Sequence, residues 1–201
     1  MSKLTAVAAK AKRCTLCPLY KNATQTVFGE GPAGATLMLV GEQPGDQEDL
    51  AGRPFVGPAG KMLDKALAAA GIDRAQVYVT NVVKHFKNEP RGKRRMHKKP
   101  NRYEVEVCKV WLDQEVALVR PALIVALGVT AASALAGKAV TLSRLRGQEV
   151  AFADGSRGWV TVHPSSILRA PDEAGRRAGY AGLVKDLKGA LKAATRRAQA
   201  A

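Results

Sequence analysis

Two short, uninterrupted apolar segments place the strongest constraint on how this chain can fold. Residues 37–40 (Leu-Met-Leu-Val) and residues 123–127 (Leu-Ile-Val-Ala-Leu) are each followed by a glycine. Runs of this length without polar alternation are typical of strands buried on both faces, as in a parallel sheet covered by helices. Segments 77–83 and 159–162 are rich in β-branched and aromatic residues, and we expect them to form two further strands.

Segments with helical periodicity lie between and after these strands. Apolar side chains recur at helical spacing between Pro58 and Gly71, between Val105 and Val119, and between Leu183 and Leu191. This alternation predicts an α/β fold, a three-layer α/β/α sandwich with a central four-stranded parallel sheet. From about Ala193 the chain is basic and alanine-rich, and we expect a frayed tail there.

Polar side chains follow three of the predicted strands at the point where each strand ends. Glu42 and Gln43 follow the first, Asn81 lies near the end of the second, and His163 follows the last. Because ligands of open parallel sheets bind at the carboxyl ends of the strands, these side chains are candidates for one site. For each residue taken alone, the alternative is a loop side chain whose hydrogen bonds are satisfied locally.

The charge of the chain indicates its partner. Lys and Arg total 32 against 17 Asp and Glu, a net charge of +15 over 201 residues, which favours a polyanion such as nucleic acid. Between residues 84 and 99 there are eight basic residues and one acidic residue. A solvated surface is the alternative interpretation of such a run. With no apolar run long enough for a membrane span and no signal-peptide pattern, we expect a cytoplasmic protein.

His97 lies inside this basic segment, in the sequence Lys-Arg-Arg-Met-His-Lys-Lys-Pro of residues 93–100. The cations around His97 indicate that an anion binds there, and two roles are possible for the imidazole. One is a phosphate contact, which is the commoner role for a histidine in a basic loop. The other is a nucleophile, because neutral imidazole attacks carbon readily.

Three cysteines and a histidine form a second set of candidate functional residues. Cys14 and Cys17 form a CxxC pair, Cys108 stands alone, and His85 is a candidate fourth ligand. Three cysteines cannot all pair as disulfides, so a metal centre is the main functional interpretation, with iron–sulfur and tetrahedral Cys3His zinc sites both compatible. The alternatives are a redox pair or an incidental CxxC, with Cys108 as a buried apolar side chain.

Four motifs in order, together with the cysteine pattern, resemble the iron–sulfur uracil-DNA glycosylases from about residue 14 to residue 187. The motifs are GEQPGD at 41–46, GRPFVGPAG at 52–60, Thr-Asn at 80–81 and HPSS at 163–166. Within that superfamily the chain is most similar to the X class (UdgX). The basic insert at 93–99 with its central His97, and the glutamine of the first motif, carry this finer resemblance.

The resemblance implies one uracil-DNA glycosylase-like domain over residues 1–201, with a basic loop at 87–100. It also implies a 4Fe-4S cluster near the N-terminal segment, held by Cys14, Cys17, Cys108 and His85, with zinc as the alternative metal. The usual fourth cysteine is replaced here by His85, a departure that the X class shares. The role expected for the cluster is structural.

The resemblance assigns roles to the residues at the strand ends. Phe55 would stack on a flipped uracil, Asn81 would pair with its O4 and N3 edge, and His163 would hydrogen-bond O2 and stabilise the departing anion. Glu42 would stabilise positive charge on the sugar. The remaining pocket and DNA contacts are expected from Gly41, Gly45, Asp46 and Ser165, with Arg169 on the DNA backbone and Leu168 as a wedge.

The X class further implies that His97 attacks C1′ of the deoxyribose and remains covalently attached in a single turnover. Gln43 would hold one ring nitrogen, leaving the other to attack. The expected phosphate contacts are Lys93, Arg94, Arg95 and Lys98. The implied partner is uracil-containing DNA, single-stranded in preference to double-stranded, with free uracil as product and a monomeric protein that associates with the nucleoid.

Two alternatives from other functional classes stay open. An ordinary multi-turnover glycosylase would release an abasic site without forming an adduct. A non-catalytic nucleic-acid-binding module would bind in a salt-dependent manner without preferring uracil.

Overall fold

Five strands form the central sheet in the computed structural model, which describes residues 2–92 and 94–199. All four predicted strands are present and mutually parallel, in the order β2-β1-β5-β7. A fifth strand, β6, pairs antiparallel with β7 at the edge. The sequence analysis missed β6, a three-residue strand with no buried side chain. The strand bounds are β1 Leu37–Gly41, β2 Val77–Asn81, β5 Leu123–Leu127, β6 Glu149–Ala151 and β7 Arg157–Thr161.

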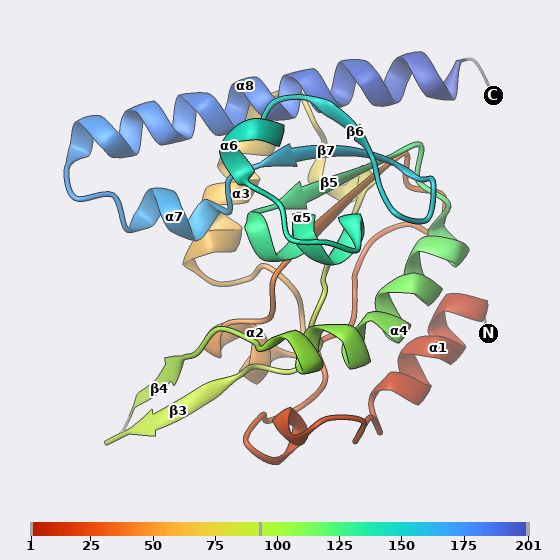
Figure 1. The fold of residues 1–201 in the computed structure, drawn as a ribbon, viewed down its shortest axis with the longest axis vertical. Coiled ribbons are helices and arrows are strands. Elements are labelled where there is room, and N and C mark those ends of the chain that lie inside the picture. The colour runs from red at the N-terminus through yellow and green to blue at the C-terminus, as the bar shows by residue number, and fades with distance from the viewer. Residues whose placement is uncertain (1, 93, 200–201) are drawn as a thin grey trace.

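Helices cover both faces of the sheet and give the predicted three layers (Figure 1). Alternate residues of β1 explain this arrangement: Met38 and Val40 pack with α4 and α5, whereas Leu37 and Leu39 pack with α3 and α8. An uninterrupted apolar strand is therefore buried on both sides. The helix bounds are α1 Lys3–Ala11, α2 Asp46–Ala51, α3 Pro58–Ala69, α4 Arg102–Val119, α5 Val129–Ala136, α6 Leu142–Leu145, α7 Pro164–Leu168 and α8 Glu173–Ala198, with 3-10 turns η1 Pro18–Lys21 and η2 Arg74–Gln76.

The C-terminal helix differs from the expectation of fraying. α8 continues to Ala198, and Ala193 and Ala194 are fully buried against the α3 side of the sheet. Alanine has the highest helix propensity and loses no side-chain entropy on burial, so the alanine-rich end both propagates the helix and packs closely. The expected frayed tail was therefore wrong as far as Ala198.

The basic segment expected to be a loop is a β-hairpin. β3 (Asn88–Arg91) and β4 (Arg94–His97) pair antiparallel, with Asn88 opposite His97. Figure 1 shows the hairpin projecting from the sandwich near α2. The hairpin thus carries His97 on a strand with defined faces. No helix within the described residues is both long and apolar enough to cross a membrane.

Candidate active site

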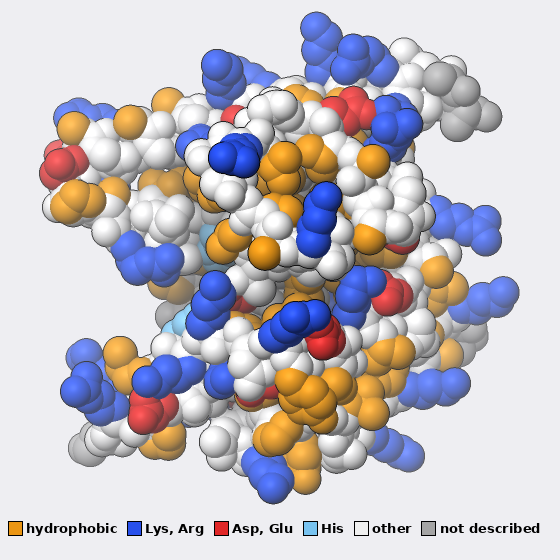
Figure 2. All heavy atoms as spheres, in the orientation of Figure 1, with side chains coloured by type: hydrophobic (Ala, Val, Ile, Leu, Met, Phe, Trp, Pro, Cys, Tyr) orange, Lys and Arg blue, Asp and Glu red, His pale blue; other side chains and the backbone are white. Residues whose placement is uncertain are grey.

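A pocket of about 590 Å³ opens at the carboxyl edge of the parallel strands. It lies between α7 and the hairpin, where the space-filling view shows a hollow with histidine atoms visible and basic side chains on both lips (Figure 2). Its lining includes all but one of the predicted catalytic and substrate-binding residues, namely Glu42, Gln43, Gly45, Asp46, Phe55, Asn81, His97, His163 and Ser165, together with the predicted DNA-backbone contact Arg169. Tertiary structure therefore brings together side chains from segments that are far apart in the sequence.

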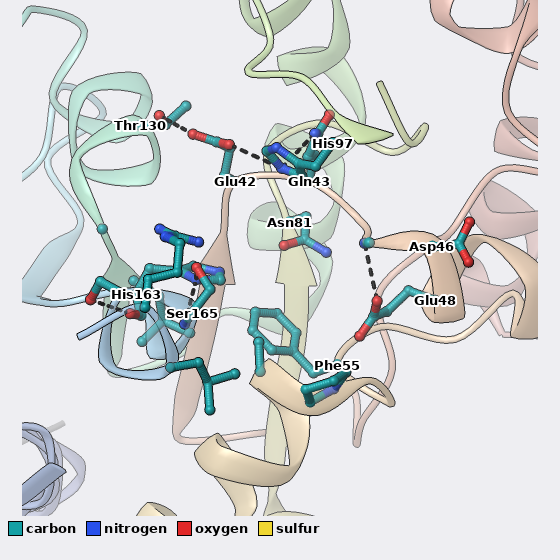
Figure 3. A pocket seen from close by; sticks show the side chains of 18 of the residues that line it. Glu42, Gln43, Asp46, Glu48, Phe55, Asn81, His97, Thr130, His163 and Ser165 are labelled. Carbon is teal, nitrogen blue, oxygen red and sulfur yellow. Dashed lines mark hydrogen bonds and ion pairs between the residues drawn. The ribbon is translucent and has the colours of Figure 1, made fainter. Parts of the chain in front are cut away.

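The floor of the pocket is a slot between Asn81 and the ring of Phe55 (Figure 3). Asn81 is 2% exposed, and its Oδ1 has no hydrogen-bond partner among the described residues. A Cβ on Gly41 would lie 2.3 Å from that oxygen and 2.6 Å from the Phe55 ring, so only glycine leaves the slot open. A buried amide oxygen without a partner is costly unless a ligand supplies one.

Phe55 holds its ring in the slot from an unusual backbone conformation. Its φ is +56°, a left-handed value that costs free energy for a non-glycine residue. The conformation is possible because Gly60 packs against it: a Cβ there would lie 1.7 Å from the Phe55 carbonyl oxygen. The second motif therefore aims an aromatic face into the pocket.

His163 lies beside Phe55, with ring centroids 6.0 Å apart. The backbone N–H of Ser165 donates to His163 Nδ1 at 3.2 Å, and the Ser165 hydroxyl lies 2.8 Å from the same nitrogen. Because Nδ1 accepts, the neutral ring carries its proton on Nε2. Burial lowers the pKa of His163 to about 4, assisted by Arg169 and His97. His163 is thus a neutral hydrogen-bond donor at neutral pH.

Glu42 and His97 approach each other on the side of the pocket that lies across from Phe55 (Figure 3). The distance from Glu42 Oε1 to His97 Nε2 is 3.6 Å, and the other oxygen of Glu42 accepts from the Thr130 hydroxyl. The His97 side chain remains 52% exposed, so a substrate can reach the imidazole. A carboxylate next to an accessible imidazole can stabilise positive charge on that ring or on a nearby sugar carbon.

Gln43 determines which nitrogen of His97 carries the lone pair. The Lys87 N–H donates to Gln43 Oε1 at 3.0 Å, which orients the amide; Gln43 Nε2 then donates to the Lys98 carbonyl at 2.9 Å. The same Nε2 lies 2.8 Å from His97 Nε2, which must therefore accept. Burial lowers the pKa of His97 despite the opposing effect of Glu42, so the ring is neutral with a lone pair on Nε2. Gln43 thus holds the unprotonated nitrogen, whereas the sequence analysis expected the attacking nitrogen to be the other one.

The residues at the start of α2 support the pocket rim. The Glu48 carboxylate accepts from the backbone N–H groups of Gly45 at 3.1 Å and Gly57 at 2.7 Å, joining the first and second motifs. Asp46 was expected to contact substrate; the residue lines the pocket, but its carboxylate accepts a 2.7 Å hydrogen bond from Arg95 Nε. Asp46 is therefore engaged with the hairpin.

The predicted phosphate contacts fall into two groups. Arg94 and Arg169 are exposed, and Arg169 lines the pocket. Lys98 pairs with Glu89 across the hairpin at 2.6 Å, and Arg95 is bound to acidic side chains of α2. Lys93 lies outside the described residues.

One cation of the same basic run is fully buried. The Lys84 ammonium lies 2.5 Å from the Glu115 carboxylate, and neither side chain has any exposure to solvent. It cannot contact DNA, contrary to the interpretation of the whole run as a binding segment.

The four candidate metal ligands, Cys14, Cys17, Cys108 and His85, are all buried. Burial raises the pKa of the Cys108 thiol to about 11, although the nearby Lys84 lowers it. His85 Nε2 lies 2.9 Å from the Thr26 hydroxyl, which itself donates to a backbone carbonyl. The ring must donate from Nε2, leaving Nδ1 buried without a partner among the described residues.

The donor types, three thiols and one imidazole nitrogen, occur in both iron–sulfur and zinc sites. Within the described part of the chain, no group of three His, Cys, Asp or Glu side chains is arranged to hold a metal ion. A zinc ion would need all its donors within about 2.0–2.3 Å of one point. An iron–sulfur cluster distributes its ligands over several iron atoms and is normally held by thiolates, with histidine replacing cysteine in some centres.

The pocket lining also holds polar residues that were not predicted from the sequence, among them Thr130 and Glu48. Thr130 follows the strand that ends at Leu127, so the strand-end rule that identified Glu42 could also have found it. Glu48 is a buried carboxylate in the first turn of α2. It accepts from the N–H of Gly45 three residues earlier, but glycine has no side chain to complete a capping box, so the sequence carried no clear signal for Glu48.

The pocket lies at the carboxyl edge of a parallel sheet, where α/β enzymes bind their ligands, and it holds a neutral histidine donor next to an exposed arginine that suits an anionic ligand. The protein-family model of the uracil DNA glycosylase superfamily matches residues 28–188 of the chain. The chain belongs to this superfamily.

Curated relatives support the same membership. The chain is 40% identical over 164 residues to the Type-4 uracil-DNA glycosylase of Thermotoga maritima, covering 81% of this chain and 82% of that protein. It is 39% identical over 174 residues to the Type-4 uracil-DNA glycosylase of Pyrobaculum aerophilum, covering 80% and 82%. A Type-5 uracil-DNA glycosylase of the latter organism is 30% identical over 176 residues, covering 77% and 74%.

Proposed function

We propose that this protein excises uracil from DNA and then captures the resulting deoxyribose covalently through His97. One observation carries the proposal: a single pocket is lined by Phe55, Asn81 and His163, which suit a flipped base, and by the exposed imidazole of His97. Base recognition and a nucleophile are therefore within one cavity.

Asn81 selects uracil by its hydrogen-bonding pattern. Its buried Oδ1 would accept from the N3–H of uracil, while its Nδ2 donates to O4. Cytosine presents an acceptor at N3 and a donor at N4, so both contacts would be mismatched. The Phe55 ring stacks on the base and recovers part of the stacking energy lost on flipping.

Bond cleavage separates charge that the pocket stabilises. As the C1′–N1 bond breaks, the electron pair leaves with uracil, and His163 donates from Nε2–H to O2 of the anion. Positive charge develops at C1′, on the side where the Glu42 carboxylate lies next to His97. The departing uracil takes a proton from water and is released as the free base.

Capture uses the lone pair on His97 Nε2. Its hydrogen bond from Gln43 breaks as the new Nε2–C1′ bond forms, and the ring becomes an imidazolium beside Glu42. Loss of the Nδ1 proton to solvent then neutralises the ring. No later step restores His97, so each molecule reacts once.

Exposed cations on both lips of the pocket would hold the DNA backbone. Arg94 lies on strand β4 of the hairpin, and Arg169 is the C-cap residue of α7. A flipped deoxyuridine is most easily presented by single-stranded DNA, because no base pair has to be broken. We therefore propose single-stranded uracil-DNA as the preferred substrate.

The test is incubation of the purified protein with a single-stranded oligonucleotide containing one uracil, followed by denaturing electrophoresis in SDS. The expected result is an SDS-resistant adduct that reaches at most one equivalent of protein. The matched thymine oligonucleotide and the His97→Ala variant should give none. A His97→Ala variant that crosslinks like the wild type would disprove the assignment of the nucleophile.

An ordinary multi-turnover glycosylase is the second candidate, favoured by the 39–40% identity to Type-4 relatives. In that case water attacks C1′ and His97 serves as a phosphate contact. Alkali-labile abasic DNA would then accumulate beyond one equivalent of protein without an adduct. The same gel, run with and without alkali, distinguishes the two.

We also propose that Cys14, Cys17, Cys108 and His85 hold a 4Fe-4S cluster, His85 through Nδ1. The support is four buried donors, including one nitrogen without a protein partner. The cluster would act as a structural link between the N-terminal segment, α4 and the segment preceding the hairpin. A brown protein with about four iron atoms per chain is expected; a colourless protein with one zinc ion would overturn the proposal.

A further inference from the structure

Among the described cations of the hairpin, Arg95 makes the most hydrogen bonds. Its Nη1 lies 2.6 Å from Asp49 Oδ2 and 3.1 Å from the Thr24 hydroxyl, and its Nε donates to Asp46 Oδ1 at 2.7 Å. Asp49 is fully buried and also accepts from the Thr24 N–H. The guanidinium therefore joins β4 to α2 through charge-assisted hydrogen bonds, and these donors are not available to a phosphate.

The position of Arg95 on the strand connects it to His97. Side chains two residues apart point to the same face of a strand, so Arg95 and His97 face the sandwich while Arg94 and Met96 face solvent. The buried ring of Phe86 lies between them: the guanidinium carbon is 5.4 Å from the Phe86 centroid, and the His97 ring is 6.2 Å from it.

We propose that Arg95 is a positioning residue for covalent capture, acting as the latch that holds the imidazole of His97 over the pocket. Without it, β4 keeps its contact with Gln43 through Lys98 but loses its anchor on α2. Phe55, Asn81 and His163, the residues proposed to bind the base, lie outside the hairpin, so uracil excision continues. The released sugar is then intercepted by water, and Arg95 determines the partition between adduct and abasic site. This inference rests on the proposed function of His97.

Three variants test the latch. Arg95→Ala removes the anchor and leaves a buried carboxylate unpaired. Arg95→Lys keeps a positive charge next to Asp49. The lysine ammonium cannot replace the planar guanidinium, which contacts Asp46 and Asp49 at the same time. Arg94→Ala removes the same charge from the neighbouring residue on the solvent face of the strand.

The measurement is the ratio of adduct to alkali-labile abasic DNA under single-turnover conditions with saturating single-stranded uracil-DNA. A displacement of about 1 Å can cost on the order of a hundredfold in rate, so Arg95→Ala should lower this ratio by roughly that factor, with total excision retained. Arg95→Lys should fall between Arg95→Ala and wild type. Arg94→Ala should weaken DNA binding and make that binding less dependent on salt. It should leave the ratio of adduct to abasic DNA unchanged. A wild-type ratio in both Arg95 variants would overturn the proposal.

Hydrogen exchange of the amides of residues 94–98 tests whether Arg95 anchors β4, independently of whether His97 captures the sugar. Both Arg95 variants should exchange faster there than wild type, whereas Arg94→Ala should not. If the wild-type protein forms no adduct, the proposed capture by His97 is wrong. The exchange data then test only whether Arg95 holds β4 in place. Unchanged exchange in Arg95→Lys and Arg95→Ala would refute it. Thermal unfolding of Arg95→Lys verifies that the comparison uses folded protein.

Discussion

The buried ion pair of Lys84 and Glu115 supports the sharpest prediction about stability. The Lys84 ammonium donates to Glu115 Oε2 at 2.5 Å, to the Thr80 hydroxyl at 2.6 Å and to the Asn81 carbonyl oxygen at 2.6 Å. Glu115 also accepts from the Gly29 N–H at 2.8 Å. Lys84→Met removes the cation and leaves a carboxylate with no exposure to solvent.

The expected loss is large because the remaining charge cannot be hydrated. Removing one partner of a buried pair costs about 3–5 kcal/mol. At roughly 2–4 °C per kcal/mol for a chain of this size, the thermal midpoint should fall by about 6–20 °C. Uracil excision should also fall, because Lys84 holds the backbone of the residue proposed to read the base.

The assay is thermal unfolding followed by circular dichroism, together with uracil release. Lys188→Met on the exposed face of α8 is the matched control and should change stability by less than about 0.5 kcal/mol. The double variant Lys84→Met with Glu115→Gln removes both charges and keeps an oxygen to accept from Gly29, so it should recover much of the loss. If Lys84→Met unfolded at the same temperature as Lys188→Met, the assigned cost of leaving Glu115 without its cation would be refuted.

Three further predictions concern the pocket. Gly41→Ala should reduce uracil release by at least about a hundredfold, because its Cβ would enter the slot at 2.3 Å from Asn81 Oδ1; release within tenfold of wild type contradicts this. The rate of adduct formation should stay constant as pH falls from 8 to about 6.5 and decline only below it, because burial lowers the pKa of His97 and the neutral ring attacks; a decline that begins above pH 7 argues against it. The folded-state pKa of His163 is about 4, below the ordinary value of about 6.5, so between these values the unfolded chain binds the extra proton and stability falls as pH falls. His163→Gln should flatten that part of the stability curve, and an unchanged slope would exclude the assigned cause.

Most of the fold was predictable because its signals are local. The apolar runs at 37–40 and 123–127 can be strands only if both faces are covered, and the structure covers both. The edge strand β6 was missed because three residues without burial carry no pattern. The hairpin was missed because its strands hold Pro90 and several cations in place of β-branched residues.

The pocket residues could be chosen from the sequence because the ends of parallel strands meet at one edge. Asn81 and His163 needed only this rule and the motif resemblance. Their hydrogen-bonding states did not follow from the sequence. The proton on His163 Nε2 depends on a local turn at Ser165, and the lone pair on His97 Nε2 depends on contacts from Gln43, which lies 54 positions away.

The sequence by itself determined the layered sheet, the residues at its carboxyl edge and the overall positive charge, since each depends on local pattern or composition. Only the tertiary structure decided what each cation of the basic run does. Lys84 is buried with Glu115, Arg95 is bound to Asp46 and Asp49, and Arg94 faces solvent. The physical reason is that a charge acts through its nearest partners, and folding brings those partners from distant parts of the chain.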